Sequence, residues 1–195
     1  MMSDCAVIFV DDRSRRNKNL EMAKSKNLNV LLWAISSINR GLINPNRTPQ
    51  IMTTCAIHFG YFEYSKRTED QHIQNNLFFG EAYLHAFLKT EEKHGFKKMP
   101  GYCKVIKRDF IVPLVHNEFL HNELSRLRES GDYYNHYWMT ADPRQIDHFE
   151  INYQLITQSS RRKNSTYYRE IIKLLYETSN KTIGNSNRDY KKWGC

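Results

Sequence analysis

The feature that most constrains this chain is a hydrophobic pattern that changes repeatedly between the period of a strand and the period of a helix. Residues 51–59 alternate between two faces, which is the period-two pattern of a half-buried strand. Other apolar residues recur at helical spacing, first at Leu28, Leu31, Leu32, Ile35 and Ile38 and later at Phe79, Ala82, Tyr83, Ala86 and Phe87. Interleaved patterns of this kind predict a sheet with helices packed on it.

The remaining segments extend this interpretation to the whole chain. Further strand-like runs occupy residues 6–10, 61–64, 102–106 and 133–139. A leucine repeat at Leu120, Leu124 and Leu127 indicates a helix that stops before Gly131. Two more helices follow, and the first of them opens with Asp142 as N-cap and Pro143 at its first position. This order predicts an α+β fold of the ferredoxin-like type, an antiparallel sheet with helices packed on one face plus C-terminal helices.

The same pattern predicts how the elements are arranged. We expect residues 51–59 to form a central strand. We expect the helix that begins near Gly80 to pack on the sheet through Ala82 and Ala86, because small side chains permit close approach. Residues 1–177 then form a single α+β domain, with one half at 5–90 and a strand and helix extension at 91–177. From Thr178 the chain is polar, so residues 178–195 are expected to be a frayed tail.

Composition limits the class of protein. Hydrophobic residues make up 40% of the 195 residues, enough for a core without a disulfide or metal. The longest apolar stretch, residues 28–38, is shorter than the roughly 20 residues that span a bilayer. The N-terminus lacks the basic and apolar regions of a signal peptide, and the four cysteines form no CxxC pair. We therefore expect a cytoplasmic protein with reduced thiols and no membrane partner.

Three short motifs follow one another in the first half of the chain. The run at residues 6–10 ends in Asp11 and Asp12, residues 55–60 read CAIHFG, and residues 79–86 read FGEAYLHA. This succession resembles the second half of a class III nucleotidyl cyclase catalytic domain. In that family a strand with a metal-binding Asp is followed by an IGIHxG strand and a YGxxVNxAxR helix. The resemblance covers about residues 5–90, and the superfamily includes bacterial antiphage pyrimidine cyclases.

The resemblance implies a nucleotidyl cyclase, a lyase that converts a nucleoside triphosphate to a cyclic mononucleotide with Mg²⁺ or Mn²⁺, here in antiviral defence. Asp11 or Asp12 would hold the metal, because carboxylate oxygens suit such cations. Gly80 and Glu81 would lie at the nucleotide, since a glycine at a helix start lets backbone N–H groups approach phosphate oxygens. Gly80 could equally relieve crowding at the helix start.

Two departures from the family pattern limit the implied activity. Leu84 and Leu88 stand where the family has the Asn and Arg that stabilise the transition state, and losing one such donor costs about 10²–10³ in rate. The family's first strand, with its own Asp, would precede Asp11, where only ten residues lie. We therefore expect an N-terminally truncated, divergent domain that binds nucleotide and is weakly active or inactive alone.

The truncation also predicts a partner. Class III cyclase sites form between two domains, and a missing first strand would leave a sheet edge with unpaired backbone groups. We expect a homodimer or a complex with a strand-donating partner. The alternative is that the C-terminal segment, residues 142–178, folds back and covers that edge.

A different class of function stays open, a non-catalytic ferredoxin-like module that binds nucleic acid or a protein partner. The net charge of +8 favours an anionic partner, although the basic residues are spread over several segments. The aromatic cluster of Tyr133, Tyr134, Tyr137 and Trp138 suits either stacking on bases or packing in a sheet.

Single residues have alternatives as well. Asp11 and Asp12 suit a turn at a strand end. His58 shares its strand face with Met52, Thr54 and Ala56, which favours a structural histidine over a catalytic base. Neither His85 nor His116 has a helical partner three or four residues away that would make a metal pair.

Overall fold

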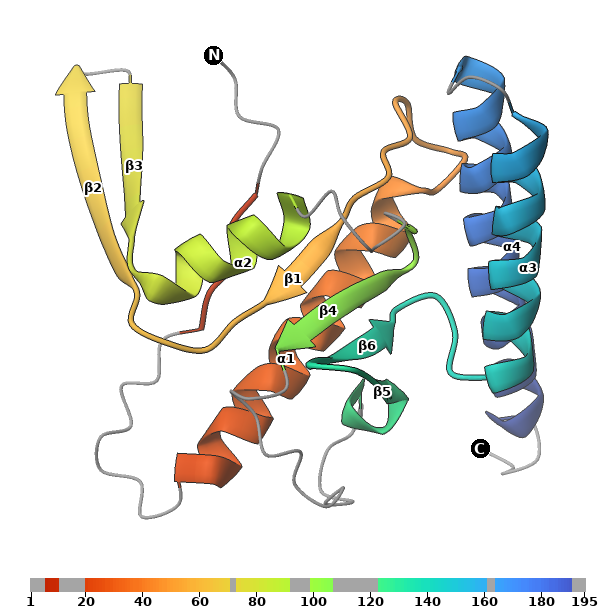
Figure 1. The fold of residues 1–195 in the computed structure, drawn as a ribbon, viewed down its shortest axis with the longest axis horizontal. Coiled ribbons are helices and arrows are strands. Elements are labelled where there is room, and N and C mark those ends of the chain that lie inside the picture. Colours follow the sequence, from red (N-terminus) through yellow and green to blue (C-terminus); the bar gives the residue numbers. More distant parts are fainter. Residues whose placement is uncertain are drawn as a thin grey trace.

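The computed structural model describes residues 6–10, 20–70, 73–91, 99–106, 123–160 and 164–190. Within these ranges a four-stranded sheet, a separate two-stranded hairpin and several α-helices make up a mixed α+β structure. Figure 1 shows the hairpin at one side of the sheet and a pair of long helices at the other. The α+β class expected from the sequence is therefore confirmed.

The sheet is mixed. Its strand order is β1 (Cys55–Ile57), β4 (Tyr102–Ile106), β6 (Tyr133–Tyr137) and β5 (Leu127–Ser130). Strand β1 runs parallel to β4, with Cys55 opposite Cys103, whereas β6 is antiparallel to both of its neighbours. The parallel pair departs from the antiparallel ferredoxin-like sheet that we expected.

The expectation of a central strand at residues 51–59 is wrong. Only Cys55–Ile57 pairs in the sheet, and β1 lies at its edge. Ile51 is 46% exposed and Phe59 is 39% exposed, so the ends of the alternating run lie outside the core. Alternation reports that an extended segment has two different faces, and it carries no information on how many strands flank it.

Helix α1 (Leu20–Leu42) supplies the hydrophobic layer on one face of the sheet. Its buried residues Leu28, Leu32 and Ile35 form one core cluster with Ile57 of β1 and Val105 of β4. The predicted helical stripe is therefore confirmed at Leu28, Leu31, Leu32 and Ile35, whereas Ile38 is 46% exposed. The helix continues through Gly41 and ends at Leu42.

The hairpin and the helix after it connect β1 to β4 along the chain. Strands β2 (Glu63–Asp70) and β3 (Ile73–Phe79) pair with each other in an antiparallel ladder. Helix α2 (Glu81–Glu91) begins directly after β3, as its apolar stripe predicted. The extended segment at residues 61–64 is confirmed as the entry to β2, but β3 was missed because its IQNNLFF sequence shows no alternation.

The predicted buried strand at residues 6–10 is wrong. These residues form no strand, and Ile8, Phe9 and Val10 are each about two-fifths exposed. The Phe9 ring instead lies 4.8 Å from the ring of Phe62 and 5.6 Å from that of Tyr64, centre to centre. A short β-branched run thus packs on the base of the hairpin, and Asp11 and Asp12 lie outside the described residues.

The C-terminal helices α3 (Pro143–Ser159) and α4 (Ser165–Tyr190) pack on each other and on the end of the sheet opposite the hairpin. Asp142 caps α3 by accepting a hydrogen bond from the Arg144 N–H, as its Asp-Pro start predicted. A second core cluster lies here, and its most buried members are Ile43, Trp138, Met139, Phe149, Ile171 and Leu175. Helix α4 runs through Tyr190, so the expected frayed tail from Thr178 is wrong at least to that point.

The helix predicted from Leu120 to Leu127 is also wrong where the structure describes it. A single 3₁₀ turn, η2 (Glu123–Arg126), leads directly into strand β5. Leu124 is buried, but Leu127 already belongs to the strand. No helix among the described residues is long and apolar enough to cross a membrane.

Candidate functional site

Two of the three motifs that resemble the cyclase family, residues 55–60 and residues 79–86, lie next to each other in the structure. The hairpin returns the chain so that the start of α2 lies against residues 58–61. The Ala82 N–H donates a hydrogen bond of 3.1 Å to the Tyr61 carbonyl oxygen. Gly80 has φ +117°, and a Cβ there would overlap the Tyr61 carbonyl. Only glycine fits this junction, so its first role is to let two backbone segments approach each other.

This geometry bears on the expected phosphate contact at Gly80. The N–H of Ala82, in the first turn of α2, is directed to Tyr61. The close approach of Gly80 to Tyr61 is what the crowding alternative predicted, and the phosphate contact of Gly80 stays a prediction.

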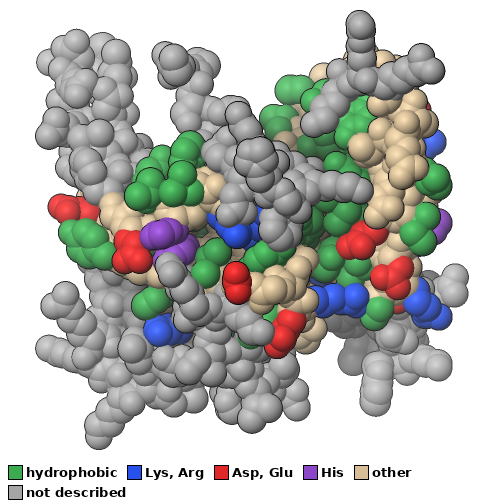
Figure 2. Space-filling view, in the orientation of Figure 1, with side chains coloured by type: hydrophobic (Ala, Val, Ile, Leu, Met, Phe, Trp, Pro, Cys, Tyr) green, Lys and Arg blue, Asp and Glu red, His purple; other side chains and the backbone are tan. Residues whose placement is uncertain are grey.

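Glu81 lies in a cluster with two histidines. The Glu81 Oε1 atom is 3.6 Å from His85 Nε2, one helical turn along α2. The ring of His85 stacks on that of His58, with centres 4.9 Å apart and an angle of 16° between the planes. The potential ligand atoms of His58, Glu81 and His85 all lie within 4.8 Å of one another. Figure 2 shows histidine and acidic side chains side by side on the visible face.

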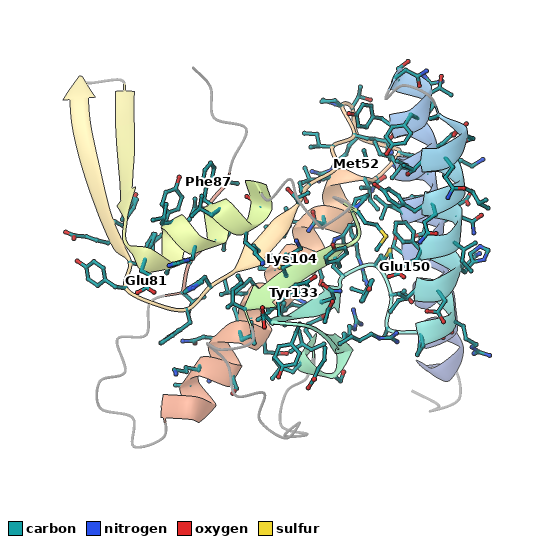
Figure 3. All side chains as sticks on the ribbon, viewed as in Figure 1. Met52, Glu81, Phe87, Lys104, Tyr133 and Glu150 are labelled. Carbon is teal, nitrogen blue, oxygen red and sulfur yellow. The ribbon has the colours of Figure 1, made fainter. Side chains whose placement is uncertain are left out.

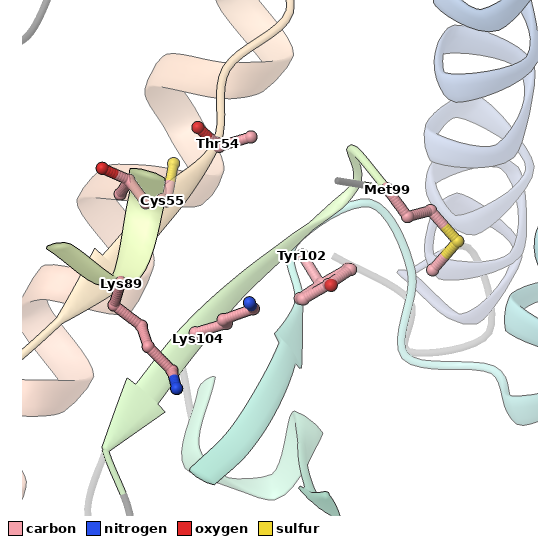
Figure 4. A pocket seen from close by; sticks show the side chains of 7 residues that line it. Thr54, Cys55, Lys89, Met99, Tyr102 and Lys104 are labelled. Atoms are coloured by element: carbon pink, nitrogen blue, oxygen red, sulfur yellow. The ribbon is translucent and has the colours of Figure 1, made fainter. Parts of the chain in front are cut away.

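A second candidate is a small pocket between α2, β1 and β4. Residues from all three elements line it, together with Met99 before β4: Thr54, Cys55, Lys89, Thr90, Met99, Tyr102 and Lys104. Figure 4 shows the lysine side chains from α2 and β4 near each other in it, and Figure 3 places Lys104 beside Tyr133 at the middle of the molecule.

Two cations converge on this pocket. The Nζ atoms of Lys89 and Lys104 lie 5.2 Å and 5.4 Å from the centre of the Tyr133 ring. Lys104 is only 8% exposed, so most of its surface is removed from water. Burial, with smaller contributions from Tyr133 and Glu150, raises the pKa of Tyr102 to about 12, so its hydroxyl stays protonated at neutral pH.

A third polar cluster lies inside the fold. The Glu123 Oε2 atom is 2.8 Å from His136 Nε2 and 3.2 Å from Arg126 Nη1. Burial lowers the pKa of His136. For Glu123, burial acts to raise the pKa, but the hydrogen bond from His136 and the charges of Arg126, His136 and Arg40 outweigh it and hold the pKa below its usual value. His136 has no exposed surface, so we interpret this cluster as structural.

Of the predicted site residues, Gly80 and Glu81 lie at the start of α2, and Asp11 and Asp12 lie outside the described residues. Leu84 and Leu88 are about half exposed on α2, where the family has polar groups. The predicted site residue Glu81 lies close to His58 and His85. This grouping was not expected, because the expectation for His85 concerned only the positions three and four residues after it. A carboxylate four residues before His85 was the available signal.

The burial of the aromatic cluster decides between its two predicted roles, stacking on bases and packing in the sheet. Tyr133, Tyr134, Tyr137 and Trp138 are each at most 8% exposed. They pack in the sheet and the core, as the sheet-packing alternative predicted, and they offer no open face for stacking on bases.

Comparisons with protein-family models, with curated proteins and with solved structures gave no match to this chain.

Proposed function

We propose that this chain is a divergent nucleotidyl-cyclase-like domain that binds a nucleoside triphosphate, with phosphate groups held between Lys89 and Lys104. One observation carries the proposal. Two lysines from different elements converge on one pocket, directly beside the helix whose sequence resembles the cyclase motif. The proposal places this binding in the cytoplasm.

The pocket has the chemistry that a phosphate group requires. Ammonium groups form short, charge-assisted hydrogen bonds to phosphate oxygens. Placing two of them near one ring concentrates positive charge, and the burial of Lys104 lowers the local dielectric screening. Thr54 and Tyr102 line the same pocket and carry hydroxyl groups that can donate further hydrogen bonds. Because the pocket is small, it suits a phosphate group better than a nucleoside.

The proposal keeps Mg²⁺ or Mn²⁺ as the cofactor, with Asp11 or Asp12 as ligand, and both aspartates lie outside the described residues. The cluster of His58, Glu81 and His85 is a poor fit for Mg²⁺, which prefers an octahedral set of oxygen ligands. When bound, such a cation would neutralise charge on the triphosphate.

Slow turnover is part of the proposal. Leu84 and Leu88 occupy the surface of α2 where the family has its transition-state Asn and Arg. Neither side chain can donate a hydrogen bond to developing charge, so binding is retained while the chemical step is lost. We expect little or no cyclic nucleotide from any of the four common triphosphates.

A homodimer also belongs to the proposal. In the described part of the chain β1 pairs on one side only, with β4, so it leaves an edge to which a second copy can add a strand. Helices α3 and α4 pack at the other end of the molecule in Figure 1, which weighs against their covering this edge. Light scattering at micromolar concentration tests this, and a clean monomer would contradict it.

Calorimetric titration of the full chain with a nucleoside triphosphate and Mg²⁺ tests the binding site. Loss of one charge-assisted hydrogen bond costs about 1.5–3 kcal/mol, so Lys104→Met and Lys89→Met should each weaken binding about 10–100-fold. Lys173→Met on the exposed face of α4 is the matched control and should leave the affinity unchanged.

Two outcomes would argue against nucleotide binding at this pocket. Unchanged affinity in both lysine variants would place the phosphates elsewhere. Metal-independent binding of single-stranded nucleic acid that weakens steeply with salt would favour the nucleic-acid module instead, because phosphate contacts release counterions.

A further inference from the structure

Three side chains with metal-ligating atoms meet where β1, the hairpin and α2 join. His58 follows β1, while Glu81 and His85 stand one turn apart on the same face of α2. The chain supplies them from two segments more than twenty residues apart, and the junction at Gly80 and Tyr61 holds those segments together.

We propose that His58, Glu81 and His85 bind a Zn²⁺ ion that links the end of β1 to the start of α2. Two imidazole nitrogens and one carboxylate oxygen form a donor set that Zn²⁺ favours, and three protein ligands leave a fourth position for water. The site is separate from the Mg²⁺ or Mn²⁺ of the nucleotide proposal, because those hard cations prefer oxygen ligands.

The distances allow this ion with modest side-chain movement. Tetrahedral Zn²⁺ with bonds of about 2.0–2.1 Å holds its ligand atoms about 3.4 Å apart. The three ligand atoms here lie within 4.8 Å of one another, so closing onto an ion needs a shift of the order of 1 Å. It also needs a rotation of the His85 ring, because its plane is only 16° from that of His58 and the nitrogen lone pairs of the two stacked rings run nearly parallel. The side chains of His85 and Glu81 are 43% and 59% exposed, which leaves them room to turn. The Nδ1 atom of His58 is buried, so this histidine is the fixed member of the set.

Binding should depend on pH and should stabilise the fold. Imidazole must be unprotonated to bind a metal, so protons compete with the ion for these ligands. Because the three ligands come together only in the folded chain, Zn²⁺ should raise the unfolding temperature in proportion to the logarithm of its concentration.

The experiment uses the full chain, freed of metal by a chelator, with no nucleotide present. Zn²⁺ is titrated by calorimetry, and Co²⁺ is titrated by visible absorption as a spectroscopic substitute. We expect one ion per chain, visible bands of tetrahedral or five-coordinate Co²⁺, and no thiolate-to-cobalt charge-transfer band. His85→Ala and Glu81→Gln, both at exposed positions, should each weaken the affinity at least about 10–100-fold.

His148→Ala is the matched control, since His148 lies exposed on α3 and hydrogen-bonds with Asn152 one turn along that helix. Far-UV circular dichroism verifies that each variant is folded. Equal Zn²⁺ affinity in wild type, His85→Ala and Glu81→Gln would overturn the proposal. A thiolate-to-cobalt band would also overturn it, as would a His148→Ala variant whose Zn²⁺ affinity falls as much, because each result marks adventitious binding. Failure of nucleotide binding leaves this result untouched, so the two proposals fail separately.

Discussion

Replacing Glu123 by glutamine should be among the most damaging single changes to this fold. One carboxylate oxygen of Glu123 contacts both His136 and Arg126. The backbone N–H of Glu123 donates a hydrogen bond of 2.8 Å to the Asn29 side chain. Glu123 thereby joins α1, η2 and β6 around one buried negative charge. Glutamine keeps the shape and removes only that charge, so the variant isolates the electrostatic contribution.

The magnitude follows from what is left behind. Glu123 is 6% exposed, and Arg126 and Arg40 remain as cations close to it. Breaking a buried ion pair by removing one partner costs about 3–5 kcal/mol, because the other charge stays desolvated. For a chain of this size each kcal/mol lowers the unfolding temperature by about 2–4 °C, so we expect a fall of roughly 6–20 °C.

Urea unfolding followed by circular dichroism measures the loss in the free energy of unfolding at pH 7. Glu177→Gln is the control, since Glu177 is half exposed on α4 and 3.9 Å from Lys173, and it should change stability by less than about 0.5 kcal/mol. A loss below about 1 kcal/mol in Glu123→Gln would refute the reasoning, because solvent would then have to screen the remaining charges.

Three further predictions concern stability and are checked by the same unfolding assay. Gly80→Ala should lower the free energy of unfolding by more than about 2 kcal/mol, because a side chain at φ +117° is strained and would meet the Tyr61 carbonyl. Gly41→Ala inside α1 has open space and should raise the free energy of unfolding by about 0.5–1 kcal/mol. Equal effects of the two substitutions would contradict this reasoning. Asp142→Ala removes the N-cap of α3 and should cost about 1 kcal/mol, and no loss would show that the cap contributes nothing. The pKa of His136 is lowered by burial, so the unfolded chain takes up a proton at this residue before the folded chain does. Stability should therefore fall as the pH drops below about 6.5, more steeply in wild type than in His136→Gln, and identical slopes would contradict the assignment.

The sequence predicted those elements whose pattern is set locally. The stripe at Leu28, Leu32 and Ile35 became the buried face of α1, and Asp142 with Pro143 began α3 as expected. The aromatic run at 133–139 became β6 and its flank, because bulky side chains favour a pleated, packed surface. In each case the periodicity or the cap chemistry lies within one turn or one strand.

The errors arose where distant contacts decide the structure. The residue pattern of 51–59 gave no sign that, within the described residues, β1 pairs with β4 alone. Residues 6–10 pack on the hairpin through Phe9 instead of joining the sheet. The lysine pocket joins residues from α2 and β4, and the histidine cluster joins β1 to α2. Neither juxtaposition follows from spacing along the chain, because the hairpin and the sheet register create both.

The nucleotide site is tested most directly by a crystal structure of the full chain with a non-hydrolysable nucleoside triphosphate and Mn²⁺. Phosphate oxygens are predicted to lie within hydrogen-bonding distance, about 2.7–3.2 Å, of the Nζ atoms of Lys89 and Lys104. A saturated complex with the triphosphate bound away from this pocket, or a pocket that stays empty at concentrations that saturate other nucleotide-binding proteins, would contradict the proposed function.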